Sequence, residues 1–366
     1  MNVAQLKRTM VLSLAIVFLT STVNAQVNQA QTHSPSAQNV STLLSSLPEA
    51  DVIVYSSPQK ILNEVAPRVV PADDLAKLRA TFVDLKRSVG IDPSSIDYVT
   101  IALRFHKPAG DLSFVPPEVM LVASGDFSAE SLITLIELAL QDGARKETYS
   151  SKSITVAKID PIAEQAKTTP LLKSFSEIGV VALNSNTLAF GNVSYLKAAI
   201  DAGNGTGRVN STAISSLLRD PNALISASGS PLTAFVKSFG LMGTETTPRE
   251  SRCDTRFGDF YAAITLNGTN FSLRGAMNTD NPDTAKIING LFSGLWQQAI
   301  TAIPDKNAQG VLQNIRIEPR ESEIVFEADV PEQTVASYIK EALKPTPPAV
   351  ATPPTKPAAK RKPRRR

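Results

Sequence analysis

The spacing Ser-x-x-Lys occurs three times, as "SPQK" (57–60), "SYLK" (194–197) and "SYIK" (337–340). In penicillin-recognising enzymes this spacing places a serine nucleophile one helical turn from a lysine, and a Lys-Thr-Gly strand accompanies it. The sequence contains no Lys-Thr-Gly, and the second and third copies resemble each other as parts of amphipathic helices. We therefore expect helix formation, rather than catalysis, to explain the repeats.

Other nucleophilic and metal chemistry lacks the residues that it needs. The chain has two histidines, His33 and His106, and one cysteine, Cys253. The segment "GLFSG" (290–294) has the wrong spacing for a nucleophile elbow and lies in a predicted helix. Zinc sites need clusters of His, Cys and acidic residues. We expect no catalytic, cofactor or metal site, with His106 exposed at a strand end.

Carboxylates are plentiful, and they leave one enzymatic alternative open. Two acids that face one cleft could hydrolyse a glycosidic bond. The second half of the chain offers several candidates for such a pair, among them Glu318, Glu321, Glu323 and Glu327.

The N-terminus has the three parts of a secretory signal. Lys7 and Arg8 precede the apolar run 10–23, and small residues end at Ala25. We expect cleavage after Ala25 and export to the periplasm or the extracellular space. The polar segment 26–46 has no acidic or basic residue and is predicted to be a disordered leader.

The C-terminal segment 344–366 is predicted to be a disordered basic tail, since its seven prolines favour extended geometry. Of the 37 basic residues, two lie in 1–25 and eight in 344–366, and neither segment holds an acid. Residues 26–343 thus keep 27 bases against all 34 acids, a net charge of −7. The tail ends in six cations: Lys360, Arg361, Lys362, Arg364, Arg365 and Arg366. These are candidates for binding anionic lipid head groups or polysaccharides, without specific recognition of nucleic acid.

Three blocks recur in order through the body of the chain, which indicates an internal duplication. Pro48, Ala50, Ser57 and Pro58 match residues 173 positions later. "FSAESLITLI" (127–136) matches 280–289, and "SYLKAAI" (194–200) matches 337–343. In each half a β-branched strand turns directly into a helix that starts at Ser-Pro. The units are predicted at 47–202 and 220–343, with the glycine-rich stretch "GNGTGR" opening a flexible seam at 203–219.

The elements expected in each half are hairpins followed by helices. This order predicts an α+β fold with two related halves, each a mainly antiparallel sheet with helices packed on one face. The striped helix 71–89 has no counterpart in the second half, where the polar loop 240–258 contains Cys253. If one half has a site of its own, we expect it near that loop. Cys253 is read as a lone thiol, with pairing between two chains left open.

The stretches "LPEADVIVY" (47–55) and "GIDPSSIDYVTIALRF" (90–105) resemble exported bacterial proteins of unknown function. These proteins begin with Leu-Pro, a strand and a helix, and contain two related α+β units. The resemblance covers about the first third of the chain. It implies the duplicated fold, and it carries no residue role or chemistry.

These features together favour an exported, non-enzymatic binding or scaffold protein, whose basic tail attracts an anionic component of the cell envelope. One alternative is an envelope hydrolase with paired carboxylates in a cleft between the halves. The other is a carrier of an apolar ligand, which would need a large apolar cavity.

Overall fold

In a computed structural model of the protein, the structure describes residues 40, 43–44, 46–89, 92–106, 116–140, 143–158, 177–230, 257–302 and 306–343. Several sequence predictions lie outside these residues. They are the signal peptide, most of the leader, His33, the helix expected to start at Pro231, Cys253 with most of its loop, and the basic tail.

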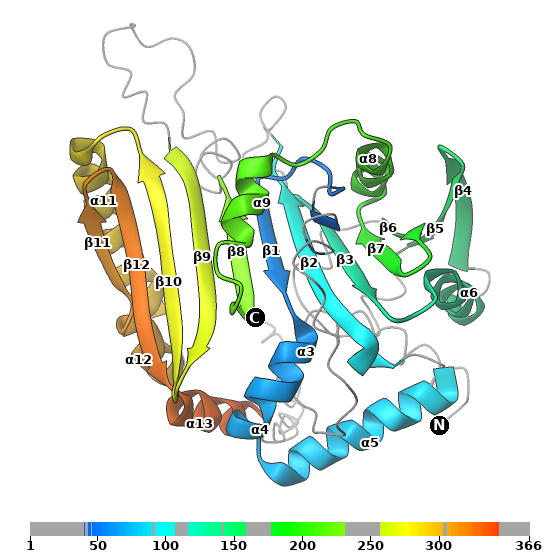
Figure 1. Ribbon diagram of the computed structural model, residues 1–366, viewed down its shortest axis with the longest axis horizontal. Coiled ribbons are helices and arrows are strands. Elements are labelled where there is room, and N and C mark those ends of the chain that lie inside the picture. Colours follow the sequence, from blue (N-terminus) through cyan, green and yellow to red (C-terminus); the bar gives the residue numbers. More distant parts are fainter. Residues whose placement is uncertain are drawn as a thin grey trace, which may run out of the picture.

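The strands form one antiparallel sheet that runs across the whole molecule (Figure 1). Their order is β11-β12-β10-β9-β8-β1-β2-β3-β7-β6-β5-β4. The strands are β1 (Val52–Ser56), β2 (Ile96–Arg104), β3 (Glu118–Gly125), β4 (Ala144–Tyr149), β5 (Lys152–Lys158), β6 (Glu177–Asn184), β7 (Thr187–Gly191), β8 (Ile225–Gly229), β9 (Phe257–Asn267), β10 (Asn270–Thr279), β11 (Arg316–Arg320) and β12 (Glu323–Pro331).

Helices connect these strands. They are α3 (Pro58–Lys60), the π-helix η1 (Ile61–Val65), α4 (Ala66–Val69), α5 (Ala72–Val89), the 3-10 turn η2 (Pro93–Ser95), α6 (Ala129–Leu140), α8 (Val193–Gly203), α9 (Ser211–Leu217), α11 (Pro282–Ala302), α12 (Lys306–Gln313) and α13 (Glu332–Ala342). Figure 1 shows α9 in front of β8 and β1, and α11 behind β11 and β12.

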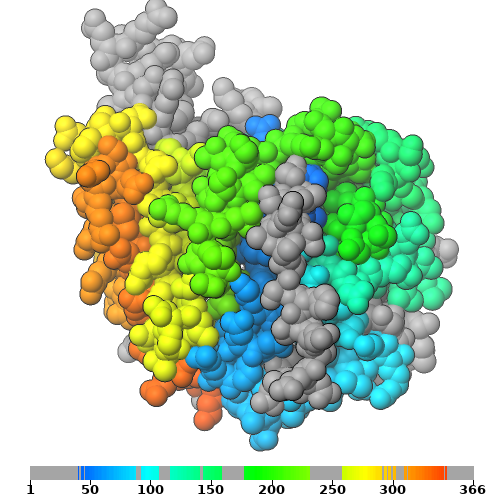
Figure 2. Space-filling view, viewed as in Figure 1, coloured from blue at the N-terminus to red at the C-terminus, as the bar shows by residue number. Residues whose placement is uncertain are grey.

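The two halves share the sheet through β1 and β8, which pair antiparallel from Val52 opposite Gly229 to Ser56 opposite Ile225. We had expected a separate sheet in each half. A strand edge with unpaired N–H and C=O groups is costly unless another strand or solvent satisfies it. Here β1 and β8 provide hydrogen-bond partners for the N–H and C=O groups at each other's edge. In the space-filling view, green residues of α9 and β8 lie between the two halves (Figure 2).

The halves repeat one connectivity. Outward from the centre, the order is β1-β2-β3-β7-β6 in the first half and β8-β9-β10-β12-β11 in the second. A helix follows the third strand in both, α6 and α11, and another follows the hairpin, α8 and α13. The α+β class with a mainly antiparallel sheet is therefore confirmed. The first half adds β5 and β4 at its outer edge.

Helices cover both faces of the sheet in the first half, whereas the sequence predicted one face. Val181 and Ala189 pack with α8, and their chain neighbours Val180 and Leu188 pack with α6. Successive strand residues point to opposite faces, so both faces of these strands were apolar enough to need a cover. We call the face that carries Val181 and Ala189 the α8 face.

The packed core begins earlier than residue 47 and continues through the predicted seam. Leu44 is fully buried on the α8 face, together with Val40 and Leu43, although residues 26–46 were predicted to be disordered. Ile214 and Leu217 of α9 are buried in the same cluster, although 203–219 was predicted to be a flexible seam. These leucines and isoleucines recur at helical spacing, so each short segment buries an apolar stripe.

Candidate functional site

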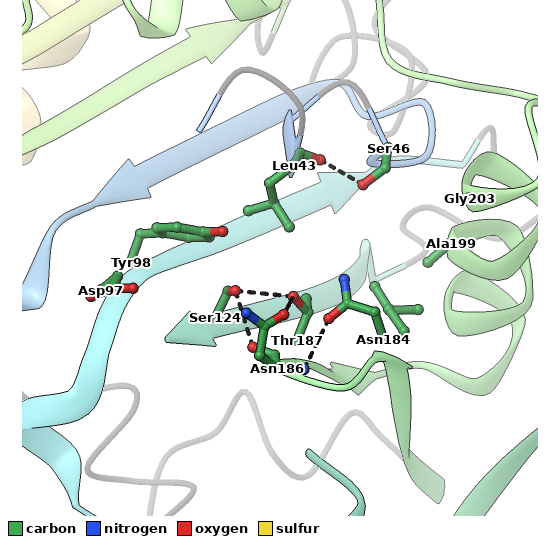
Figure 3. Close-up of a pocket in the computed structure, with 11 residues that line it drawn as sticks. Leu43, Ser46, Asp97, Tyr98, Ser124, Asn184, Asn186, Thr187, Ala199 and Gly203 are labelled. Carbon is green, nitrogen blue, oxygen red and sulfur yellow. Dashed lines mark hydrogen bonds between the residues drawn. The ribbon is translucent and has the colours of Figure 1, made fainter. Parts of the chain in front are cut away.

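The α8 face of the first half contains a cavity of about 470 Å³ (Figure 3). It lies where β2 begins, where β3 ends, and at the hairpin that joins β6 to β7. Its lining residues are Leu43, Ser46, Asp97, Tyr98, Ser124, Leu183, Asn184, Asn186, Thr187, Ala199 and Gly203. All of them precede residue 204, so the cavity belongs to one half of the molecule.

Strand pairing brings the polar floor together. Tyr98 of β2 lies opposite Ser124 of β3, and Ser124 lies opposite Thr187 of β7. Opposed residues of antiparallel strands share a face, so three side chains from distant parts of the sequence line one surface. Ser124 is 3% exposed and Thr187 is 1% exposed. Polar residues this deeply buried need hydrogen-bond partners.

The buried hydroxyl groups form a chain of hydrogen bonds. Ser124 Oγ donates to the main-chain oxygen of Asn186 at 3.0 Å. Thr187 Oγ1 lies 3.0 Å from Ser124 Oγ and 3.5 Å from Oδ1 of Asn186, and it can donate one proton to either. The chain fixes the hairpin against β3, which holds the floor of the cavity in one geometry.

Asn184 presents a donor to the cavity. Its Oδ1 accepts the main-chain N–H of Asn186 at 3.0 Å. Because a main-chain N–H can only donate, this bond identifies the oxygen of the amide and directs the NH₂ group away from the turn. Figure 3 shows the amide nitrogen on the side away from the turn.

Asp97 and Tyr98 form one end of the floor. Gln59 Nε2 donates to Oδ1 of Asp97 at 2.9 Å. Burial raises the pKa of Tyr98, the hydrogen bond with Ser124 lowers it, and the charge of Asp97 adds to the rise. The net effect is a higher pKa than usual, so Tyr98 keeps its proton at neutral pH. The ring of Tyr55 lies 6.3 Å from that of Tyr98.

The remaining wall is apolar. Leu43, Leu183 and Ala199 contribute hydrocarbon, and Gly203 ends α8 without a side chain. Gly203 is exposed, and a Cβ added there would meet nothing within 4 Å. The site thus joins a polar floor to an apolar wall, and it can bind a molecule that has both kinds of surface.

The Ser-x-x-Lys pair at 194–197 lies elsewhere on the α8 face, and its two side chains contact different carboxylates. Ser194 Oγ donates to Glu118, while Lys197 Nζ pairs with Glu147. A nucleophile and its base must contact each other. These two residues instead attach the helix to two different strands.

His106 belongs to the cluster around Glu118. Its Nε2 lies 2.9 Å from Oε2 of Glu118, and Nε of Arg104 donates to the same oxygen at 2.7 Å. Burial would raise the pKa of Glu118, but hydrogen bonds from Ser194, Arg104 and His106 hold it below its ordinary value. The hydroxyl of Ser194 bonds the carboxylate rather than the imidazole, so the cluster is a structural clamp.

The glutamates that the sequence left open lie far along the sheet, on β11, β12 and the turn between them. Glu327 and Glu318 both contact Arg320, at 2.9 and 3.5 Å. Glu321 and Glu323 are exposed. None of these carboxylates lines the cavity.

The described ranges contain no group of three or more His, Cys, Asp or Glu placed to hold a metal ion. Within those same ranges, no helix is long and apolar enough to cross a membrane. The six tail cations, Lys360, Arg361, Lys362, Arg364, Arg365 and Arg366, lie outside the described residues.

Sequence reasoning missed the cavity, although one signal pointed to it. Ser124 and Thr187 stand at core-facing positions of otherwise apolar strands, and "LNSNT" (183–187) places two asparagines around a two-residue turn. A buried polar residue on a core face is more informative than an exposed charged one. The pattern became meaningful only once the register aligned Ser124 with Thr187.

No model of a known protein family matches the chain, and no curated protein matches it at a significant level. Among solved structures, three crystal forms of TP0453 are distantly similar. Form III gives a TM-score of 0.39 at 11% identity, covering 81% of this chain and 97% of that one. Forms I and IV each give 0.38 at 11% identity, covering 81% of this chain and 96% and 95% of theirs. A likeness this distant carries no information on function.

Proposed function

We propose that this chain is an exported, non-enzymatic binding protein that holds a small polar molecule in the cavity of its first half. The observation that carries the proposal is the lining itself. Hydroxyl and amide groups on Tyr98, Ser124, Asn184, Asn186 and Thr187 converge on a cavity of about 470 Å³. Small-molecule sites span about 300–1,000 Å³ and use a few fixed polar groups for orientation.

The composition of the lining supports binding over hydrolysis. Glycoside hydrolysis uses two carboxylates about 5–9.5 Å apart, one on each side of the scissile bond. Asp97 is the one carboxylate among the described residues that line the cavity. The hydrolase alternative also needed a cleft between the halves, and there β1 and β8 are joined by a hydrogen-bonded ladder.

The lining also favours a polar ligand over an apolar one. A carrier of an apolar molecule would bury its ligand among hydrocarbon side chains, and buried hydroxyl groups would lose hydrogen bonds with water without replacement. In this cavity Leu43, Leu183 and Ala199 are a minority of the lining residues. Most of the others offer donors and acceptors.

The basic tail would hold the body near an anionic surface. Six cations at 360–366 carry the same sign, and each contributes about 1 kcal/mol near an anionic membrane. The signal peptide pattern would place the protein in the periplasm or outside the cell. In this proposal the tail localises the protein at an anionic surface, and the cavity binds the ligand.

A ligand panel tests the proposal. Thermal unfolding of the full chain is measured with neutral sugars, charged sugars, amino acids and octanoate. We expect a polar solute to raise Tm by mass action. Gly203→Phe, which adds a ring in open space at the cavity, should remove the shift. Gly290→Phe, at an exposed helix position with the same open space, should keep it. A shift with octanoate alone, or none with any solute, overturns the proposal.

A further inference from the structure

We infer that the ligand of this cavity is an uncharged ring that carries adjacent hydroxyl groups, which is the chemistry of a neutral hexose or a short saccharide. The inference rests on the proposed function and deepens it. It follows from three features of the cavity: its charge, its mixture of donors and acceptors, and its two unlike walls.

The charge of the cavity argues against an anionic ligand. Among the described residues, the lining includes Asp97 and no lysine, arginine or histidine. A buried anion needs a cationic partner, and here it would meet the like charge of Asp97 instead. An ammonium group could pair with Asp97, whose Oδ1 accepts a hydrogen bond from Gln59, so charge alone excludes only an anion.

The mixture of donors and acceptors also favours hydroxyl groups. An ammonium group only donates, so it cannot accept from the NH₂ group of Asn184. A hydroxyl group both donates and accepts. Hydroxyl groups of a ligand can therefore accept from Asn184 and donate to acceptors elsewhere on the floor. A site built for such bonds rejects molecules that lack them.

The two walls match the two surfaces of a pyranose ring. Its hydroxyl groups project around the edge, and its C–H groups form an apolar face. Leu43, Leu183 and Ala199 offer hydrocarbon to that face, and the floor of Ser124 and the hairpin amides offers bonds to the edge. Neither a simple lipid chain nor a small ion would contact both the hydrocarbon side chains and the polar floor favourably.

The second half of the molecule serves as an internal control. Its hairpin repeats the scaffold: the N–H of Gly125 donates to the oxygen of Asn186 at 3.2 Å, and that of Thr279 donates to Ser322 at 2.8 Å. The side chains differ, because the hairpin positions of Asn184 and Thr187 are occupied by Arg320 and Glu323. The shared bond is structural, and the amide that faces the cavity is specific to the first half.

The test is isothermal titration of the full chain with methyl glycosides of glucose, galactose and mannose. Glucosamine, glucuronate and cyclohexanol vary charge and hydroxyl number. We expect a methyl glycoside to bind at least tenfold more tightly than any of these three. Asn184→Asp keeps the acceptor for the Asn186 N–H, removes the NH₂ donor, and should weaken binding about tenfold with Tm unchanged. Asn278→Asp, at the position of the second half that corresponds to Ser124, should leave binding unchanged.

Each other outcome is decisive. If glucosamine or glucuronate binds most tightly and Asn184→Asp changes the affinity, the ligand class is wrong while the proposed function stands. If no compound binds, or if Gly203→Phe has no effect on binding, both are overturned. If methyl glycosides bind and Asn184→Asp binds as wild type does, the placement of the sugar on this floor is wrong.

Discussion

Ser57 and Ser230 occupy equivalent positions in the two halves and make reciprocal main-chain hydrogen bonds. The N–H of Ser57 donates to the oxygen of Leu224 at 3.2 Å, and the N–H of Ser230 donates to the oxygen of Asp51 at 2.7 Å. Both serines lie 173 positions apart, as do Asp51 and Leu224. Reciprocal contacts of this kind define an isologous interface, as between two copies of one protein. The repeated sequence at the start of each half is therefore also the junction between them.

Gly229 is expected to be essential to this junction. Its φ is +148°, and a Cβ there would lie 2.0 Å from the oxygen of Asp51. Gly229→Ala should lower the free energy of unfolding by at least about 2 kcal/mol. The backbone strain at this φ and the displacement of β1 by the new Cβ both destabilise the folded chain. Urea denaturation measures the change. Gly290→Ala in α11 meets open space and should raise stability by about 0.5–1 kcal/mol. Equal effects of the two variants would contradict the strain argument.

Leu44 should contribute to the stability of the fold as a core residue does, although it lies in the predicted leader. Its side chain is fully buried on the α8 face. Leu44→Ala should cost about 2–5 kcal/mol of unfolding free energy, the range for large-to-small changes in a core. Chemical denaturation checks this value. A loss below about 0.5 kcal/mol would mean that this segment does not pack in solution.

Glu118 should make stability depend on acid pH. The pKa of Glu118 is lowered in the folded chain, so its contribution to the free energy of unfolding is complete above its unfolded pKa of about 4.3. That contribution is lost as the pH falls through the lower pKa of the folded chain. Glu118→Gln should cost about 1.5–3 kcal/mol at pH 7, the range for hydrogen bonds to charged groups. The difference from wild type should shrink below about pH 4.

Urea denaturation across this pH range measures the effect of Glu118→Gln. Glu323→Gln, at an exposed position, provides the control and should leave stability unchanged at each pH. A difference for Glu118→Gln that stays constant from pH 7 to pH 3 would exclude a role for its charge.

The basic tail should carry salt-sensitive attachment to anionic surfaces. Removing residues 344–366 should abolish sedimentation with phosphatidylglycerol vesicles at low salt. The intact chain should be released as salt rises, because exposed charges are screened within about 8 Å at physiological ionic strength. Neutral vesicles should bind neither form. Equal sedimentation of both forms with anionic vesicles would remove the tail from the proposal.

Strands with apolar, β-branched runs could be predicted from the sequence, as could the order of elements in each half. β1, which opens the first half, and α3, which starts at Pro58, lie where that pattern predicts a strand and a helix. β4 was missed because "ARKETY" is an edge strand, and edge strands carry charged residues in place of an apolar pattern. From the sequence alone, residues 311–318 are predicted to form a strand, but α12 runs to Gln313 and β11 starts only at Arg316. The apolar "GVL" (310–312) fits either type of element.

The site could not be predicted, because it depends on register. Ser124 and Thr187 are 63 positions apart, and only strand pairing places their hydroxyl groups 3.0 Å from each other. The direction of the Asn184 NH₂ group depends on the hairpin turn, because the N–H of Asn186 binds the amide oxygen. Local sequence patterns describe neither relationship. Ser194 and Lys197, which the sequence singled out, proved to form a structural hydrogen bond and ion pair.

The most direct measurement is an NMR titration of the full chain, labelled with ¹⁵N-asparagine, with a methyl glycoside. We expect the side-chain amide signal of Asn184, identified by its loss in Asn184→Asp, to shift saturably while that of Asn278 stays fixed. We also expect the glycoside to be recovered intact. An unmoved Asn184 signal at saturating sugar, or cleavage of the glycoside, would contradict it.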